Sequence, residues 1–201
     1  MEKLVVIDGS FWLFSCYYAT AAMGNLMVNK DGVPTNAVYG FANRLESLLK
    51  QNPEYIVVAF DAKGKTFRSE LLEEYKGTRK PMQPELKQQV PLMKELLKAM
   101  NITVVEQEGY EADDILGTIA KESAAKGIDV SIVSGDRDLL QLADEHIKIR
   151  IPKTKKGVTE VEDYYPSDVF NLYGVTPHEF IDVKALSLIH ISEPTRQEAI
   201  S

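Results

Sequence analysis

The segment LVVIDGS, residues 4–10, decides the fold, because an uninterrupted apolar run ends on an acidic residue and a glycine. Continuous runs of valine and isoleucine are typical of strands that are covered on both faces, as in a parallel sheet. The same pattern returns along the chain. The predicted strands cover residues 4–7, 55–60, 102–105, 130–133 and 146–151.

Segments with helical spacing of apolar residues lie between these strands. They cover residues 36–50, 84–100 and 111–126, and Gly127 supplies a helix stop after the last of them. Strands that alternate with helices indicate an α/β fold. We therefore predict three layers, with a central, mostly parallel sheet and helices on both faces. Residues 62–84 are basic and contain glycine and proline, which predicts a mobile loop or arch over one edge of the sheet, with a solvated surface loop as the alternative.

The composition favours one globular domain. The chain has 201 residues, of which 44% are hydrophobic and 26% are charged. The single cysteine, Cys16, excludes an internal disulfide and fits a reducing, cytoplasmic setting. The first residues do not form a signal peptide, and no apolar run is long enough to cross a membrane.

The net charge of −7 argues against a nucleic-acid coat over the whole surface. Local binding stays open, because the basic residues are segregated. Residues 148–156 carry five Lys or Arg and no acid, and residues 63–87 carry seven Lys or Arg against four Glu.

Acidic residues follow the predicted strands. Parallel strands deliver their carboxyl ends to one edge of a sheet, so we expect these side chains to converge there. We call this group the acidic edge. Its seven members are Asp8, Asp61, Glu111, Asp113, Asp114, Asp136 and Asp138.

Clustered carboxylates repel one another and need a compensating cation. Oxygen ligands without His or Cys select a hard ion, Mg²⁺ or Mn²⁺, and two such ions could clamp a phosphodiester and activate water. Any one of these acids alone could be a helix cap or a turn residue. Acids at four separate strand ends are much less expected by chance.

Other candidate groups are weaker. Ser10 has no His to activate it and is better interpreted as a helix N-cap. Glycine-rich phosphate motifs are absent from the sequence. Trp12 and its aromatic neighbours favour a core role, whereas Tyr39 and Tyr75 could stack on a base.

Several longer motifs carry a resemblance. They are VIDGS (6–10), NAVYGF (36–41), VAFDAKGKTFRSE (58–70), EYKGTR (74–79), GYEADDILGT (109–118), SGDRDLLQL (134–142) and YGVTPHEFIDVKAL (173–186). With these motifs the chain resembles the 5′→3′ exonuclease domains of bacterial DNA polymerase I, within the flap endonuclease family, from residue 3 to about residue 186. The resemblance implies the flap endonuclease, or PIN-like, fold with a basic helical arch.

The resemblance implies structure-specific cleavage of DNA or RNA–DNA primers near a 5′ end, with two Mg²⁺ or Mn²⁺ ions, by a monomer that serves replication and repair. By position, six acids resemble the first metal cluster, and Asp138 resembles a ligand of the second metal, with Asp136 between the two. Lys76 and Arg79 resemble the catalytic, phosphate-contacting cations. The predicted DNA contacts are Lys63, Lys65, Arg68 and Tyr39.

Two departures from the family stand out. Ser15 occupies a position where the family usually has Arg. After Leu186 the family continues with Gly-Asp-x-Ser-Asp and a helix-hairpin-helix that grips DNA, whereas this chain reads SLIHISEPTRQEAIS. We therefore expect residues 1–186 to form an incomplete nuclease domain and residues 187–201 to be a foreign tail, with an unusual but genuine tail as the alternative. Weak activity or none is the expected consequence.

Three alternatives stay open from the sequence. The chain could belong to a stand-alone 5′-exonuclease without a polymerase. It could be a non-catalytic module that binds branched DNA. It could also be an α/β domain with a regulatory Mg²⁺ site, against which the separate basic arch argues, and which salt-sensitive DNA binding would exclude.

Overall fold

The computed structural model describes residues 3–21, 26–72, 81–155 and 158–192. Its centre is a six-stranded sheet in the order β3-β2-β1-β4-β5-β6. All neighbouring strands are parallel except β5 and β6, which are antiparallel. The strands are β1 (Lys3–Asp8), β2 (Tyr55–Ala59), β3 (Thr103–Val105), β4 (Asp129–Val133), β5 (Ile147–Lys155) and β6 (Val158–Tyr164).

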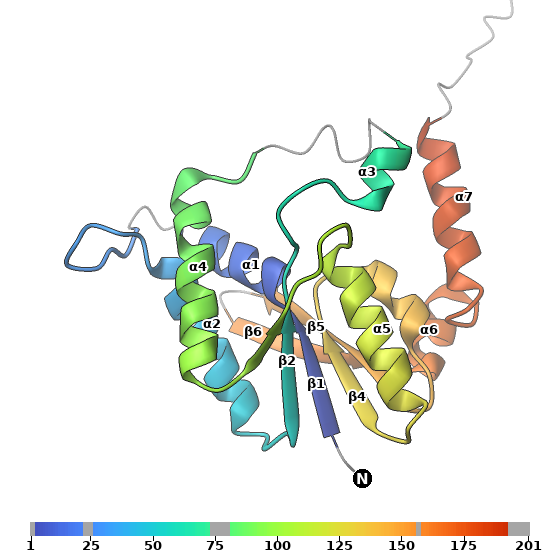
Figure 1. Ribbon diagram of the computed structural model, residues 1–201. Helices are drawn as coiled ribbons and strands as arrows, with labels where there is room; N and C mark the ends of the chain where they lie inside the picture. Colours follow the sequence, from blue (N-terminus) through green and yellow to red (C-terminus); the bar gives the residue numbers. More distant parts are fainter. Residues whose placement is uncertain (1–2, 22–25, 73–80, 156–157, 193–201) are drawn as a thin grey trace, which may run out of the picture.

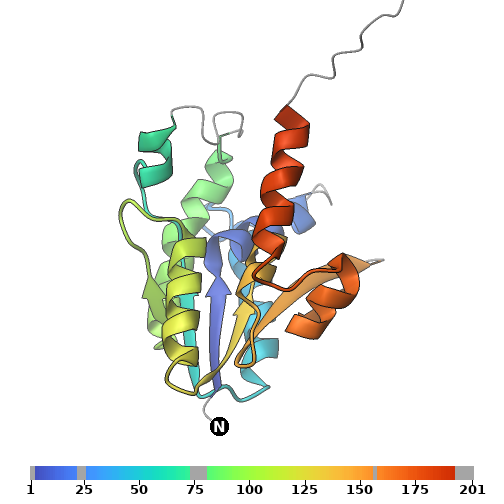
Figure 2. The same cartoon turned by 90° about the vertical axis from the view of Figure 1, so that its right-hand side faces the viewer.

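Helices cover both faces of this sheet, which confirms the predicted three-layer α/β fold (Figures 1 and 2). The helices α1, α2 and α4 pack on one face, and α5 packs on the other. The helices are α1 (Gly9–Ala21), α2 (Asn36–Leu49), α3 (Phe67–Leu71), α4 (Pro84–Ala99), α5 (Ala112–Ala124), α6 (Pro166–Tyr173) and α7 (Phe180–Ser192), with a 3₁₀ helix η1 (Arg137–Leu142). Within the described ranges, no helix is both long and apolar enough to cross a membrane.

Strand alternation divides the core into two clusters. Along β1, Val6 packs on the face covered by α5, whereas Ile7 packs on the face covered by α1 and α2. Both residues have no exposed surface. Each face of β1 is therefore apolar, which explains the uninterrupted apolar run in the sequence.

The register places three strand ends together. Asp8 pairs with Ala59 of β2, and Ile7 pairs with Val133 of β4. Because these pairs are parallel, the residues that follow β1, β2 and β4 emerge at the same edge of the sheet. Figure 1 shows this edge below α3 and beside α5.

Three cations of the basic run on β5 are paired with acids of β6. Lys148 Nζ lies 2.6 Å and Arg150 Nε 2.9 Å from Asp163 on β6, and Lys153 pairs with Glu162. Burial raises the pKa of Asp163, but the hydrogen bonds and charges of Lys148 and Arg150 outweigh this and hold it below its ordinary value. The charge segregation predicted for residues 148–156 is therefore wrong for these three cations, because β6 brings acids beside them.

Other boundaries differ modestly from the prediction. The third predicted helix is α5, which ends at Ala124. Gly127 follows with a left-handed φ of 79°, a backbone conformation that is typical just after the end of a helix. The arch segment contains α3, and its residues 73–80 lie outside the described residues. The helix α7 crosses residue 187, where we set the start of a foreign tail; that domain boundary stays a prediction.

Candidate functional site

Asp8 lies at the end of β1 and joins three elements. One carboxylate oxygen, Oδ1, accepts a 2.8 Å hydrogen bond from the backbone N–H of Phe11 and so caps the first turn of α1. The other oxygen accepts a 2.8 Å bond from the Ser134 hydroxyl, just after β4. Asp8 is only 6% exposed.

The charge on Asp8 is disfavoured. Burial raises the pKa of Asp8 to about 6, although the hydrogen bonds from Phe11 and Ser134 lower it. The nearby charges of Asp61 and Asp136 add to the increase in pKa. A cation beside these three carboxylates would favour the ionised form, so their electrostatics fit a bound metal ion.

Asp61 follows β2 and forms hydrogen bonds with the first residues of both α1 and α5. Its side chain accepts a 2.9 Å hydrogen bond from the backbone N–H of Ala112, where α5 begins. Its own backbone N–H donates to the Ser10 hydroxyl at 3.0 Å. Ser10 is therefore an acceptor for Asp61, while Asp8 caps α1, so the N-cap role predicted for Ser10 is wrong.

Three acids lie at the start of α5. Asp114 accepts a 3.0 Å hydrogen bond from the backbone N–H of Glu111, which is typical of a capping arrangement. Asp114 also receives two 2.7 Å hydrogen bonds from the guanidinium of Arg68, which lies 3.8 Å from Glu111. Asp113 lies in the first turn of α5 and is half-buried.

Two further acids follow β4. Asp136 caps η1, because its Oδ1 accepts a 2.8 Å hydrogen bond from the backbone N–H of Asp138. Asp138 in turn forms a 2.6 Å ion pair with Lys184 of α7. The hydrogen bond that Lys184 donates to Asp138 within this ion pair raises the pKa of Lys184 above its ordinary value.

The register brings the ends of β1, β2 and β4 to one edge, where Asp61 and Asp136 lie close enough to Asp8 to raise its pKa, while the convergence of all seven side chains stays a prediction. The contacts of these side chains include backbone N–H groups, Arg68 and Lys184. Within the part of the chain that the structure describes, no three His, Cys, Asp or Glu side chains already stand in metal-binding arrangement. The candidate donors are all oxygen atoms, which fits a hard divalent ion.

The predicted DNA contacts lie in different surroundings. Lys63 and Lys65 are exposed between β2 and α3, and Tyr39 is an exposed residue of α2. Arg68 is placed against Asp114. Lys76 and Arg79, the predicted catalytic cations, lie outside the described residues.

Two important groups were missed in the sequence. Ser134 is completely buried, and its hydroxyl both donates to Asp8 and accepts from the backbone N–H of Asp136 at 3.1 Å. Lys184 lies 46 residues from its partner along the chain. The only sequence signal for either residue is its place within the motifs SGDRDLLQL and YGVTPHEFIDVKAL.

The positioning helices are joined by a buried amide pair. Gln89 of α4 donates to the Asn36 side chain at 2.9 Å and accepts from the backbone N–H of Ala37 at 2.8 Å. Both amide side chains are fully buried. This pair fixes α4 against the start of α2, which explains the polar first residue of the NAVYGF motif.

Known proteins share this fold. Zinc-bound T5 5′-exonuclease superposes with a TM-score of 0.67 and 23% identity, over 92% of this chain and 66% of that one. The catalytic core of Rad2 in complex with DNA substrate gives a TM-score of 0.56 and 18% identity, over 90% and 52%. At these identities the likeness concerns the fold alone.

Sequence comparison identifies the family. DNA polymerase I of Bacillus caldotenax is 46% identical over 186 residues, and that of Bacillus subtilis (strain 168) is 45% identical over 186 residues. Each match covers 92% of this chain but only 20% of the relative, so the chain spans about a fifth of their length. The family model described as "5′-3′ exonuclease, N-terminal resolvase-like domain" matches residues 3–174 of this chain. The chain therefore belongs to the family of 5′-3′ exonuclease N-terminal domains that bacterial DNA polymerase I carries.

Proposed function

We propose that the acidic edge is the site of a divalent-metal-dependent 5′-nuclease that cleaves DNA near a 5′ end. The observation that carries the proposal is the buried Asp8 carboxylate, whose charge is opposed by burial and by Asp61 and Asp136. Such a group is costly as a purely structural cap, and perturbed carboxylates mark functional sites. Family membership supports the same conclusion.

The metal-holding residues would be Asp8, Asp61, Glu111, Asp113, Asp114, Asp136 and Asp138. Bound Mg²⁺ or Mn²⁺ would supply Lewis-acid stabilisation of phosphodiester oxygens and an activated water. The chain's own residues orient this edge, since Ser134 holds Asp8 and the N–H of Ala112 holds Asp61.

Basic and aromatic side chains would bind the strand. Lys63, Lys65 and Tyr39 are exposed, and Lys76 and Arg79 are proposed to contact phosphate during cleavage. Solved proteins of this fold include complexes with DNA substrate. We also propose that RNA–DNA primers are substrates, that the protein acts as a monomer and that it works in the cytoplasm.

The test is cleavage of a 5′-labelled flap duplex by excess chain, so that slow turnover is still seen. We expect product with Mg²⁺ or Mn²⁺ but not with EDTA. Asp61→Ala should abolish it, whereas Glu122→Ala, an exposed acid on α5, should not.

The same assay separates the rival functions. Flap binding without cleavage, both by this chain and by a chain extended with the family's Gly-Asp-x-Ser-Asp motif and helix-hairpin-helix, would overturn the nuclease proposal and favour a non-catalytic DNA-binding module. Equal cleavage by Asp61→Ala would show that the product comes from elsewhere. Retention of the flap should weaken as salt rises, because phosphate contacts release counterions.

A further inference from the structure

Two exposed aromatic rings meet at the start of α5. Phe67, the first residue of α3, and Tyr110, just before α5, have ring centroids 5.8 Å apart and ring planes tilted by 56°. Tyr110 is 49% exposed and Phe67 is 39% exposed. Figure 1 shows α3 above the loop that leads into α5. The pair therefore presents aromatic surface to solvent, and each ring supports the other.

Backbone contacts hold this pair in place. The N–H of Phe67 donates to the Gly109 carbonyl at 2.9 Å, and the N–H of Tyr110 donates to the Gln107 carbonyl at 3.2 Å. Gly109 has a left-handed φ of 84°, which glycine adopts without strain. The Arg68 guanidinium lies 4.5 Å from the centre of the Phe67 ring. Phe67 thus contacts both a cation and Tyr110, and Tyr110 is the more open ring.

The rings lie close to proposed metal ligands. Tyr110 directly precedes Glu111 in the chain. Arg68, which follows Phe67, donates two 2.7 Å hydrogen bonds to Asp114. A strand whose phosphate is bound at these carboxylates through a metal ion therefore has its neighbouring bases at the same end of α5 as the rings.

The surrounding charges favour a base at Tyr110 and phosphates elsewhere. The exposed cations Lys63 and Lys65 precede Phe67 on the segment between β2 and α3. Glu108, an exposed acid, lies two residues before Tyr110 and would repel a phosphate there, but not the neutral face of a base. Surfaces that bind single strands commonly combine cations for the backbone with aromatic rings for the bases.

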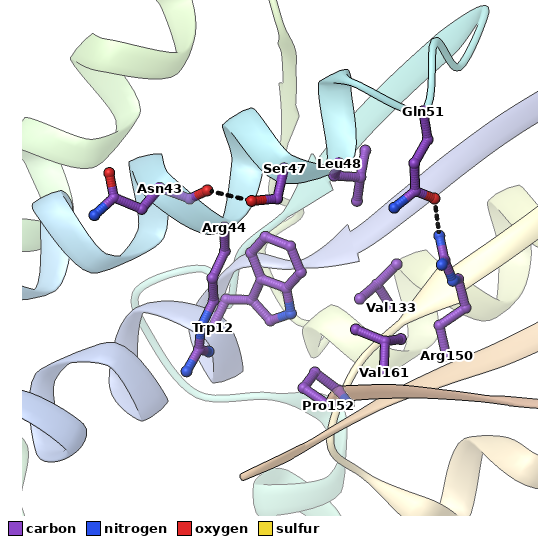
Figure 3. Close-up of a pocket in the computed structure, with 10 residues that line it drawn as sticks. All are labelled: Trp12, Asn43, Arg44, Ser47, Leu48, Gln51, Val133, Arg150, Pro152 and Val161. Carbon is purple, nitrogen blue, oxygen red and sulfur yellow. Dashed lines mark hydrogen bonds between the residues drawn. The ribbon is translucent and has the colours of Figure 1, made fainter. Parts of the chain in front are cut away.

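The chain's only tryptophan does not offer such a platform. Trp12 lines a cavity of about 290 Å³ together with Arg44, Arg150 and Val161 (Figure 3). It is only 3% exposed, and its ring contacts Phe41 edge-on with centroids 5.3 Å apart. The faces of the indole are therefore covered by protein, which confirms the core role predicted for Trp12.

We propose that Tyr110, supported by Phe67, stacks on a base of the unpaired 5′ strand beside the acidic edge. This role rests on the proposed function, because it requires the strand to pass the acidic edge. Stacking on an aromatic ring tolerates every base, since each has a π-face. Tyr110 would then position the strand without reading its sequence.

The test removes single bases from the unpaired 5′ arm of a flap duplex and keeps every phosphate. Each abasic arm is bound to the full chain at low salt in EDTA, and fluorescence anisotropy gives the dissociation constant. We expect one or two positions at which loss of the base weakens binding by the parent about fivefold or more. Tyr110→Leu should weaken binding of the intact arm by the same factor and lose the sensitivity to those bases, as in a double-mutant cycle.

Two further variants separate stacking from other effects. Tyr110→Phe keeps the ring and should bind both the intact and the abasic arms as the parent does. Tyr55→Leu removes a ring that is 50% exposed at the start of β2, at the opposite edge of the sheet, and should change nothing.

Other results would contradict the stacking role of Tyr110. Equal binding of the intact arm by the parent and Tyr110→Leu would do so, as would equal sensitivity of both to the missing base. If no abasic position weakened binding by the parent while cleavage in Mg²⁺ persisted, the stacking role would be wrong and the proposed function would stand. Loss of both flap binding and metal-dependent cleavage in the parent would overturn the proposed function and the stacking role together.

Discussion

Arg68 of α3 and Asp114 of α5 form two parallel hydrogen bonds of 2.7 Å each. The guanidinium fork matches the carboxylate and joins the arch segment to the acidic edge. Arg68 also lies 4.5 Å from the centre of the Phe67 ring. A residue that we predicted as a DNA contact is therefore placed as the partner of a proposed metal ligand, and it neutralises part of the charge that a metal ion would neutralise.

Arg68→Ala should tighten Mn²⁺ binding while it destabilises the metal-free chain. The guanidinium is about one-third exposed, so we expect a loss of about 0.5–1 kcal/mol in free energy of unfolding, measured in EDTA. The same energy, freed from competition, would tighten Mn²⁺ binding about two- to fivefold. Lys121→Ala removes a cation from the remote Asp144 and is the matched control. Weaker Mn²⁺ binding in Arg68→Ala would contradict this account.

Asp8→Asn should stabilise the metal-free fold above about pH 6. The folded-state pKa of Asp8 is raised to about 6, so the folded chain binds a proton between about pH 6 and pH 4 that the unfolded chain does not. The unfavourable contribution of Asp8 is therefore complete at high pH and disappears in acid. We expect a gain of about 1–3 kcal/mol near pH 8, shrinking toward zero near pH 4.

Chemical denaturation in EDTA at several pH values measures this difference. Asp31→Asn changes an exposed carboxylate and serves as the control. If Asp8→Asn were less stable than the parent near pH 8, the hydrogen bonds from Phe11 and Ser134 would outweigh burial, contrary to our account.

Gly135→Ala should destabilise the fold, because there is no room for the added Cβ. A Cβ at Gly135 would lie 1.9 Å from the Phe11 ring, whose own backbone N–H holds Asp8. We expect a cost of about 1–3 kcal/mol. Adding Phe11→Ala should recover part of it in a double-mutant cycle. Gly117→Ala is the control, since its Cβ would meet Leu142 at an ordinary 3.5 Å inside α5. Strict additivity of the two substitutions would contradict the steric explanation.

His146 should titrate above its ordinary pKa. Its Nδ1 lies 2.9 Å from Asp129, and this hydrogen bond is the main cause of the raised pKa. Because the folded-state pKa is raised, the pair stabilises the fold below the unfolded value of about 6.5 and loses this effect as pH rises through the folded value. In Asp129→Asn, proton NMR should show a lower titration midpoint for the His146 ring than in the parent chain. An unchanged midpoint would show that the hydrogen bond to Asp129 does not raise the pKa of His146.

The sheet and the acids that follow it were predictable, because their signals are local. The apolar run before Asp8 and the one before Asp61 each predict a doubly covered strand, and parallel pairing then brings their ends to one edge. The charge on β5 was misjudged because its partners lie on β6, where Glu162 and Asp163 interrupt any apolar pattern.

Side-chain partnerships were less predictable, because they depend on residues far apart in the chain. Ser134 meets Asp8 across 126 positions, and Arg68 meets Asp114 across 46. The residues that flank each of them in the sequence do not indicate which distant residue it contacts. The cavity beside Trp12 was likewise hidden, since an aromatic residue in an apolar helix is normally interpreted as core.

The central claim is that carboxylates from separate strand ends form one divalent-metal site. Loss of the free Mn²⁺ signal in electron paramagnetic resonance, on titration with the chain, tests it most directly. We predict that the parent chain binds Mn²⁺, that Asp61→Asn weakens this binding about tenfold or more, and that Asp129→Asn, at the opposite edge of the sheet, leaves it unchanged. Equal Mn²⁺ affinity in the parent and Asp61→Asn would contradict the account.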